Sequence, residues 1–181
     1  VDRYFVAAGT NGYSGKVTFR AKGSACVYDP VSGERTAWRN GEELRLHPSQ
    51  SLFVEFGSAQ TPGTACSLKE MPCSFAGWKL SFNAGWGAPE CITLDSLVSW
   101  TEIPEFSPEA KAYCGTVAYE TEFEMNGCGG RVVLDLGRVE SVAKVFGNGR
   151  EVRTLWCMPY SCDITDYVRS GGNALKIEVT N

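Results

Sequence analysis

Hydrophobic and polar residues alternate over short stretches along most of this 181-residue chain. The clearest case is the stretch 116–125, where Tyr119, Thr121, Phe123 and Met125 are separated by glutamates. A period of two places the apolar side chains on one face and the charged ones on the other, which is typical of a half-buried β-strand. Shorter stretches with the same character predict further strands at 78–82, 91–94, 132–137, 142–146, 151–155 and 174–179.

The first 57 residues predict a small antiparallel β unit. Val17, Phe19 and Ala21 alternate with basic and polar residues, so we expect a strand over 17–21. Turn signals such as Asn40-Gly41 separate this stretch from the others. About six short strands joined by tight turns account for the pattern.

Residues 58–76 are poor in hydrophobic residues and contain Pro, Gly, Ser and Thr, which predicts a linker. Residues 77–181 then form a second unit. Within it we expect a long loop over 101–115 and one helical turn near Thr165, which is a plausible N-cap. Gly147-Asn148-Gly149 predicts a tight hairpin turn. The fold class is therefore all-β, an antiparallel β-sandwich preceded by a small antiparallel β unit.

Composition narrows the functional classes. Apolar residues make up 43% of the chain, enough to bury a core, and the net charge is −4. The 17 basic residues are scattered among 21 acidic ones, which argues against a nucleic-acid partner. No run of 18 apolar residues occurs, so we expect no membrane-spanning helix and no membrane partner.

Eight cysteines, an even number, favour a secreted or periplasmic protein, although buried free cysteines would fill a core equally well. Cys157 and Cys162 bracket a short loop and are the best candidates for a disulfide. There is no C-x-x-C pair, and His47 is the only histidine and is expected at the surface. We therefore predict no metal site and no cofactor.

No nucleophile elbow, phosphate-binding loop or dinucleotide fingerprint occurs, so we expect no enzyme activity from this chain alone. Glu120, Glu122 and Glu124 share one strand face and have two interpretations. They are either a solvated face or a catalytic carboxylate pair, and we favour the solvated face because like charges on an exposed strand need no chemistry.

A set of short motifs in the second unit resembles the galactose-binding-like jelly roll of large glycoside hydrolases. The resemblance is to the sugar-binding domain of family 2 enzymes, and most closely to the C-terminal β-sandwich of family 106-type α-L-rhamnosidases. The first unit resembles what precedes that sandwich in the rhamnosidase-type enzymes. Two departures are Cys114, where those enzymes commonly have Ser, and the turn after Asn148-Gly149, which lacks a second Gly. The motifs are Cys114-Gly115-Thr116-Val117-Ala118-Tyr119, Leu134-Asp135-Leu136-Gly137-Arg138-Val139, Asn148-Gly149, Leu155-Trp156, Pro159-Tyr160, Asp163-Ile164-Thr165, Gly172-Asn173-Ala174-Leu175 and Val179-Thr180-Asn181, and in the first unit Tyr4-Phe5, Tyr28-Asp29-Pro30 and Leu44-Arg45-Leu46.

In such enzymes catalysis belongs to a separate barrel domain. The resemblance therefore implies a piece of a longer polypeptide, a non-catalytic carbohydrate-binding or scaffolding module of a secreted glycoside hydrolase. Its partners would be a carbohydrate and the catalytic domain of the same polypeptide. The alternative is a purely structural module that docks that domain and never contacts sugar.

Sugar recognition needs an aromatic ring and planar polar groups. The candidates are Trp86, Trp156, Tyr160, Asn148 and Arg153. Trp86 lies in a Gly-rich loop and is the one we expect to be exposed. For Trp156 the competing interpretation, which we favour, is packing against the sandwich edge, with Asp163 capping the turn that follows. Trp78 and Trp100 are expected in the core.

Overall fold

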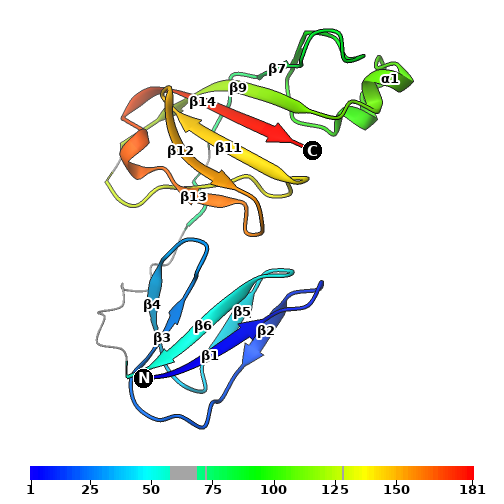
Figure 1. Cartoon of the computed structure of the whole chain (residues 1–181). Coiled ribbons are helices and arrows are strands. Elements are labelled where there is room, and N and C mark those ends of the chain that lie inside the picture. Colours follow the sequence, from blue (N-terminus) through cyan, green and yellow to red (C-terminus); the bar gives the residue numbers. More distant parts are fainter. Residues whose placement is uncertain (58–68, 72, 128) are drawn as a thin grey trace. The chain divides into compact units, whose positions relative to one another are not determined.

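The computed structural model describes residues 1–57, 69–71, 73–127 and 129–181 (Figure 1). They form two compact units, Val1–Glu70 and Met71–Asn181. Both are built from antiparallel strands, so the predicted all-β, antiparallel sandwich class is confirmed. Residues 58–68 and 72 of the expected linker lie outside the described residues. No described helix has the length and apolar character needed to cross a membrane.

The described part of the first unit has six strands in two small sheets that enclose one core. A four-stranded sheet has the order β1-β6-β3-β4, and β2 pairs with β5. Buried aliphatic residues from β5 and β6, together with Phe56, form the centre of the core. The strands are β1 (Asp2–Ala7), β2 (Tyr13–Lys16), β3 (Ala25–Tyr28), β4 (Arg35–Trp38), β5 (Glu43–Leu46) and β6 (Ser51–Phe56).

The strand predicted over 17–21 is wrong, although its apolar side chains do face the core. The strand in this region is β2, which ends at Lys16. Beyond it, the Asn40 side chain takes the place of a partner strand. Its Oδ1 accepts from the Phe19 N–H at 2.8 Å, and its Nδ2 donates to the carbonyls of Phe19 and Ala21 at 2.9 and 3.1 Å. Val17 still pairs with the backbone of Gly41 and Glu42, and the Asn40 amide serves Phe19 and Ala21 beyond it.

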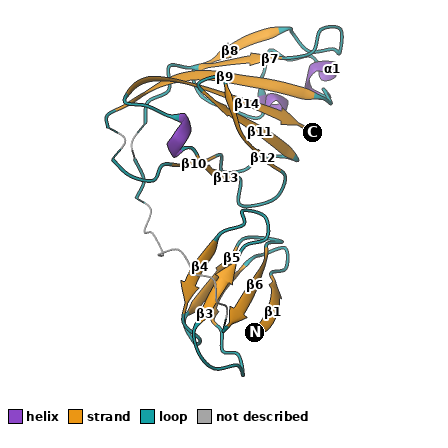
Figure 2. Cartoon of the chain, turned by 60° about the vertical axis from the view of Figure 1, so that its left-hand side comes forward, coloured by secondary structure: helices purple, strands orange, loops and turns teal. Residues whose placement is uncertain are grey.

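The second unit is a sandwich of a large and a small sheet (Figure 2). The large sheet has the order β12-β11-β14-β9-β7-β8, and the small one pairs β10 with β13. Side chains from both sheets meet in one hydrophobic core. The strands are β7 (Trp78–Ser81), β8 (Cys91–Leu94), β9 (Thr116–Met125), β10 (Val133–Asp135), β11 (Val142–Gly147), β12 (Arg150–Leu155), β13 (Ser161–Asp163) and β14 (Gly171–Thr180).

The central pair of the large sheet, β9 and β14, is hydrogen-bonded along all ten residues of each strand. The alternation predicted for β9 is confirmed, because Thr121, Phe123 and Met125 are buried while Glu122 and Glu124 are exposed. Tyr119 is half-buried on the inner face, and burial raises its pKa to about 12. The glutamates therefore lie on the solvent face of the sheet, as we favoured.

The expected long loop over 101–115 is wrong in part, since it contains helical structure. A 3-10 turn covers Trp100–Glu102, and helix α1 covers Pro108–Lys111. The Ser107 hydroxyl accepts from the Ala110 N–H, and Pro108 occupies the first helical turn, where its missing N–H costs nothing. Trp78 is buried as predicted, whereas Trp100 is only half-buried against the core.

Cys157 and Cys162, the best candidates for a disulfide, are not linked in the structure, where both are thiols. Cys162 lies on β13 and is 4% exposed, with its sulfur in the hydrophobic core. Burial raises the pKa of this thiol to about 11. Cys162 therefore acts as a small core residue, the alternative that the sequence had left open.

Candidate functional site

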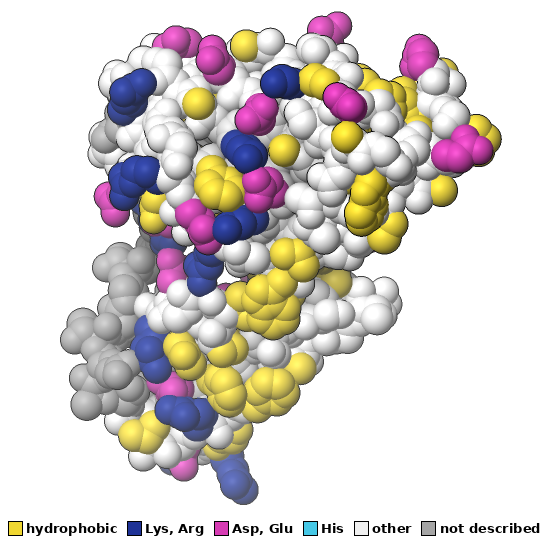
Figure 3. Space-filling model, turned by 45° about the horizontal axis from the view of Figure 1, so that its top comes forward, with side chains coloured by type: hydrophobic (Ala, Val, Ile, Leu, Met, Phe, Trp, Pro, Cys, Tyr) yellow, Lys and Arg dark blue, Asp and Glu magenta, His cyan; other side chains and the backbone are white. Residues whose placement is uncertain are grey.

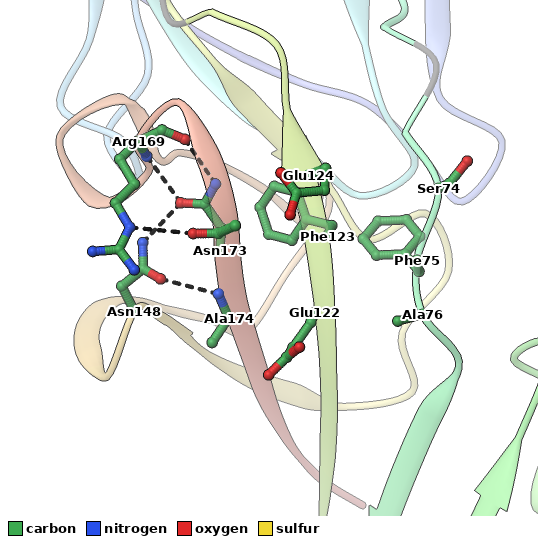
Figure 4. A pocket seen from close by; sticks show the side chains of 11 residues that line it. Ser74, Phe75, Ala76, Glu122, Phe123, Glu124, Asn148, Arg169, Asn173 and Ala174 are labelled. Atoms are coloured by element: carbon green, nitrogen blue, oxygen red, sulfur yellow. Dashed lines mark hydrogen bonds between the residues drawn. The ribbon is translucent and has the colours of Figure 1, made fainter.

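A groove of about 550 Å³ lies over the β9–β14 pair, and we call it the β9–β14 groove (Figure 4). It is lined from three sides. Asn148, Asn173 and Arg169 come from one side, Glu122 and Glu124 from β9, and a short segment before β7 closes the other side.

Asn148 is the predicted site residue that the structure places in this groove. It lies at the tip of the β11–β12 hairpin with φ 49°, followed by Gly149 with φ 78°. Positive φ at both positions is the primed turn expected of Asn-Gly. Both amide donors and the oxygen are already used, in bonds to Tyr167 O, Asn173 Oδ1 and the Ala174 N–H. Asn148 therefore shapes the groove and has no unused donor for a ligand.

Asn173 holds the adjacent loop closed and is only 3% exposed. Its Oδ1 accepts from the Arg169 N–H, and its Nδ2 donates to the carbonyls of Arg169 and Gly171. Arg169 uses only its Nε, which donates to Gly172 O at 3.2 Å. Within the described residues its two terminal nitrogens have no partner, so Arg169 brings unused donors to the groove.

The groove is open because small residues on β14 lie opposite large residues on β9. In the β9–β14 register, Glu122 faces Ala174 and Glu124 faces Gly172. Neither carboxylate has a hydrogen-bond or ion-pair partner in the part of the chain that the structure describes. Glu120 on the same face differs, since it pairs with Lys79 at 3.8 Å. Two unpaired carboxylates therefore line a space that side chains on β14 leave open.

Phe75 supplies the aromatic wall and is 40% exposed. Its backbone forms an isolated bridge with Phe123, and its ring centroid lies 5.8 Å from that of Phe123 and 5.3 Å from that of Trp78. Because both neighbouring rings are buried, Phe75 is held in place while part of it stays accessible. Sequence reasoning missed Phe75, since it falls within the stretch assigned to the linker.

Trp86 is 60% exposed, as expected, but lies outside the groove. It belongs to the loop that joins β7 to β8 at one edge of the large sheet. Its ring centroid is 6.4 Å from that of the buried Tyr113. The loop also approaches helix α1, where a Cβ at Gly87 would lie 3.2 Å from the Glu109 side chain. Trp86 is thus an exposed aromatic on a supported loop.

Trp156 follows β12 at the opposite edge of the sheet and is 62% exposed, so the packing role we favoured for it is wrong. Tyr160 fills that role instead. It is 8% exposed and its hydroxyl donates to Ser141 O at 2.8 Å. One aromatic of this loop therefore anchors it and the other faces solvent.

Arg153 is half-buried on β12, where its positive charge partly offsets the effect of burial on the pKa of Cys162. Asp163 caps the next turn, as expected, because its Oδ1 accepts from both the N–H and the hydroxyl of Thr165. Thr165 is therefore not the N-cap but the first residue of the 3-10 helix Thr165–Tyr167. Partial burial acts to raise the pKa of Asp163, but hydrogen bonds from Thr165 and Arg131 lower it overall.

The groove thus combines an aromatic ring, two carboxylates and a guanidinium. Carboxylates accept hydrogen bonds from hydroxyls, and an arginine donates to ring or hydroxyl oxygens. Acidic and basic side chains are interspersed over the face of the second unit that Figure 3 shows. Among the described residues no group of three or more His, Cys, Asp or Glu could hold a metal ion.

Comparison with known proteins relates the chain to glycoside hydrolases. A solved rhamnosidase from Novosphingobium sp. PP1Y is similar over 99% of this chain, with 29% identity and a TM-score of 0.79. A protein named "Putative beta-glucuronidase" from Formosa agariphila is 30% identical over 129 residues, or 68% of this chain. A solved β-glucuronidase from an uncultured Clostridium sp. shares the fold over 65% of this chain, with 21% identity and a TM-score of 0.51. No protein-family model matches.

The chain spans 18% of the rhamnosidase and 11% of the Formosa protein. It is therefore a glycoside hydrolase-associated β-sandwich that matches a fragment of those enzymes.

Proposed function

We propose that the chain is a non-catalytic accessory module of a glycoside hydrolase and that the β9–β14 groove binds a hydroxyl-rich sugar. The observation that carries the proposal is a groove whose lining includes the partly exposed Phe75 and the unpaired carboxylates of Glu122 and Glu124. The similarity to a rhamnosidase, of which the chain covers only 18%, supports an accessory role.

The chemistry of the groove suits a neutral sugar. The face of a sugar ring carries C–H groups that pack on an aromatic ring, and its edge carries hydroxyl donors. Each carboxylate can accept two such donors, while Arg169 can donate to a hydroxyl oxygen. Because Phe75 is the one partly exposed aromatic residue that lines the groove among the described residues, we expect weak binding, with Kd on the order of 1 mM.

Titration calorimetry with rhamnose- and galactose-containing oligosaccharides tests this role. We expect Phe75→Ala and the double variant Glu122→Gln, Glu124→Gln each to weaken binding about tenfold. Glu120→Gln is the matched control, since Glu120 lies on the same strand face but outside the groove. Equal affinity of all variants, or no binding by the wild type, would contradict the sugar-binding role. Aryl glycosides should not be turned over by this chain.

The second candidate is a structural module that docks a catalytic domain. Trp86 and Trp156, both exposed and both outside the groove, favour it, because large exposed aromatics are common at interfaces. Trp86→Ala and Trp156→Ala in the longer enzyme distinguish the two roles. Docking predicts that these variants lower the stability of the whole enzyme, whereas sugar binding at the groove predicts no change.

A further inference from the structure

The outer face of the four-stranded sheet in the first unit carries a second, unrelated set of ligand-binding groups. Tyr4, Leu52, Val54 and Phe56 point the other way, into or against the core. On the outer face the register sets side chains from all four strands in one row. That row, in order from β1 to β4, is Phe5, Phe53, Tyr28 and Arg35.

Three of these four residues are aromatic, and their rings are close neighbours. The ring centroids of Phe5 and Phe53 are 5.4 Å apart, and those of Phe53 and Tyr28 are 6.2 Å apart. The Arg35 guanidinium lies over the Tyr28 ring at 3.9 Å. Phe5 is 63% exposed, more than any other aromatic residue in the described parts of the chain. An apolar ring at the sheet edge is thus left open to solvent.

A buried carboxylate organises two arginines beside this row. Glu55 is 2% exposed and pairs with Arg3 at 2.7 Å and with Arg35 at 3.3 Å. Its Oε1, the atom nearest Arg3, has no hydrogen-bond partner in the described structure, because the contact with Arg3 lacks hydrogen-bond geometry. The Arg3 side chain is 57% exposed. Most of its donors are therefore available to a ligand from solvent.

The charges of Arg3, Arg35 and Glu55 do not cancel. Two guanidinium groups share one carboxylate, which leaves an excess of one positive charge in a chain whose net charge is −4. One excess positive charge is too little to bind the many phosphates of a nucleic acid. It is enough to pair with a single carboxylate of a ligand.

We propose that this aromatic and arginine face, formed by Arg3, Phe5, Tyr28, Arg35, Phe53 and Glu55, binds an acidic sugar chain that carries uronate groups. Phe5 packs against the C–H face of a sugar ring. The planar guanidinium of Arg3 takes the carboxylate of that sugar or of the next one in its two-pronged geometry. Glu55 orients the arginine from beneath. The site is separate from the β9–β14 groove and does not depend on the function proposed for it.

Titration of the full chain with hexagalacturonate tests the proposal, with maltohexaose as the uncharged probe and poly-L-glutamate as a charged probe without sugar. We expect hexagalacturonate to bind, to bind more weakly as salt is added, and to bind at least about tenfold more tightly than either of the other two. Phe5→Ala and Arg3→Ala should each weaken its binding about tenfold.

Two matched variants make the result specific. Arg39→Ala removes a positive charge from the same unit at a side chain that is 86% exposed and outside this face, and should change little. Phe75→Ala removes the ring of the other groove and should leave hexagalacturonate binding unchanged. Thermal unfolding of each variant confirms that it is folded. The proposal is overturned if hexagalacturonate does not bind, if Phe5→Ala or Arg3→Ala binds as the wild type does, if Arg39→Ala is weakened as much as Arg3→Ala, or if poly-L-glutamate binds equally well.

Discussion

The side-chain amides of Asn148 and Asn173 are joined by a hydrogen bond of 2.8 Å, in which Asn148 Nδ2 donates to Asn173 Oδ1. This bond ties the tip of the β11–β12 hairpin to the start of β14. With the further bonds of both amides it fixes the loop that carries Arg169. One wall of the candidate groove is therefore held by two side chains that have little left to offer a ligand.

Replacing Asn173 with Ala should destabilise the second unit by about 1–3 kcal/mol, because the substitution leaves three partly buried backbone groups without these partners. Asn173 is 3% exposed, so water cannot easily replace the lost bonds. Urea denaturation measures the difference. Asn126→Ala is the control, since Asn126 is exposed, and it should lie within about 0.5 kcal/mol of the wild type. A similar small effect for both variants would show that the network is dispensable.

Replacing Asn40 with Ala tests the side-chain amide that bonds backbone groups in the first unit. The Asn40 amide makes three bonds to Phe19 and Ala21, where no strand partner is present. We expect a loss of about 1–3 kcal/mol and faster amide hydrogen exchange at Phe19. Arg39→Ala, which removes only a surface ion pair, should cost less than about 1 kcal/mol. Unchanged exchange at Phe19 would argue that other contacts hold this segment.

The Asn40 side chain, which bonds the backbone in place of a strand, explains where sequence reasoning succeeded and where it failed. Strands such as β9 were predictable because burial of one sheet face forces a period of two. The segment 17–21 has that period without being a strand, because the Asn40 side chain, and not a partner strand, bonds the backbone of Phe19 and Ala21. The alternation of apolar and polar residues indicates which side chains face inward. It does not indicate which group forms hydrogen bonds with the backbone.

The site was less predictable than the fold for a similar reason. Phe75 and Arg169 reach the groove from segments far apart in sequence, and neither belongs to a motif. Trp156 and Tyr160 lie in one loop, yet only Tyr160 packs in the hydrophobic core, with its hydroxyl donating to the Ser141 carbonyl. Composition could suggest an aromatic and polar site, but tertiary packing decides which ring is accessible.

Asp163 makes the stability of the second unit depend on pH. Its pKa is lowered in the folded state, since hydrogen bonds from Thr165 and Arg131 outweigh the opposing effect of burial. A lowered folded pKa means that the ionised group stabilises the fold above its unfolded pKa of about 3.9 and that this contribution is lost as the pH falls through the folded value. We expect Asp163→Asn to be less stable than the wild type near neutral pH.

The difference between the two proteins should shrink below about pH 4. Urea midpoints measured at neutral pH and near pH 3 give the comparison. Asp166→Asn is the control, because Asp166 lies nearby and is exposed. A difference that stays constant with pH would mean that the variant acts through packing and not through charge.

Exposed thiols should react with iodoacetamide faster than buried thiols when the native protein is treated near pH 8. Cys91 and Cys114 are exposed, whereas Cys26 and Cys162 are 2% and 4% exposed. Burial raises the pKa of both buried thiols, that of Cys162 to about 11, so little reactive thiolate is present. Peptide mass spectrometry should show rapid labelling of Cys91 and Cys114, and labelling of Cys26 and Cys162 only after denaturation. Recovery of a peptide with Cys157 and Cys162 linked by a disulfide would contradict the thiol state of the structure.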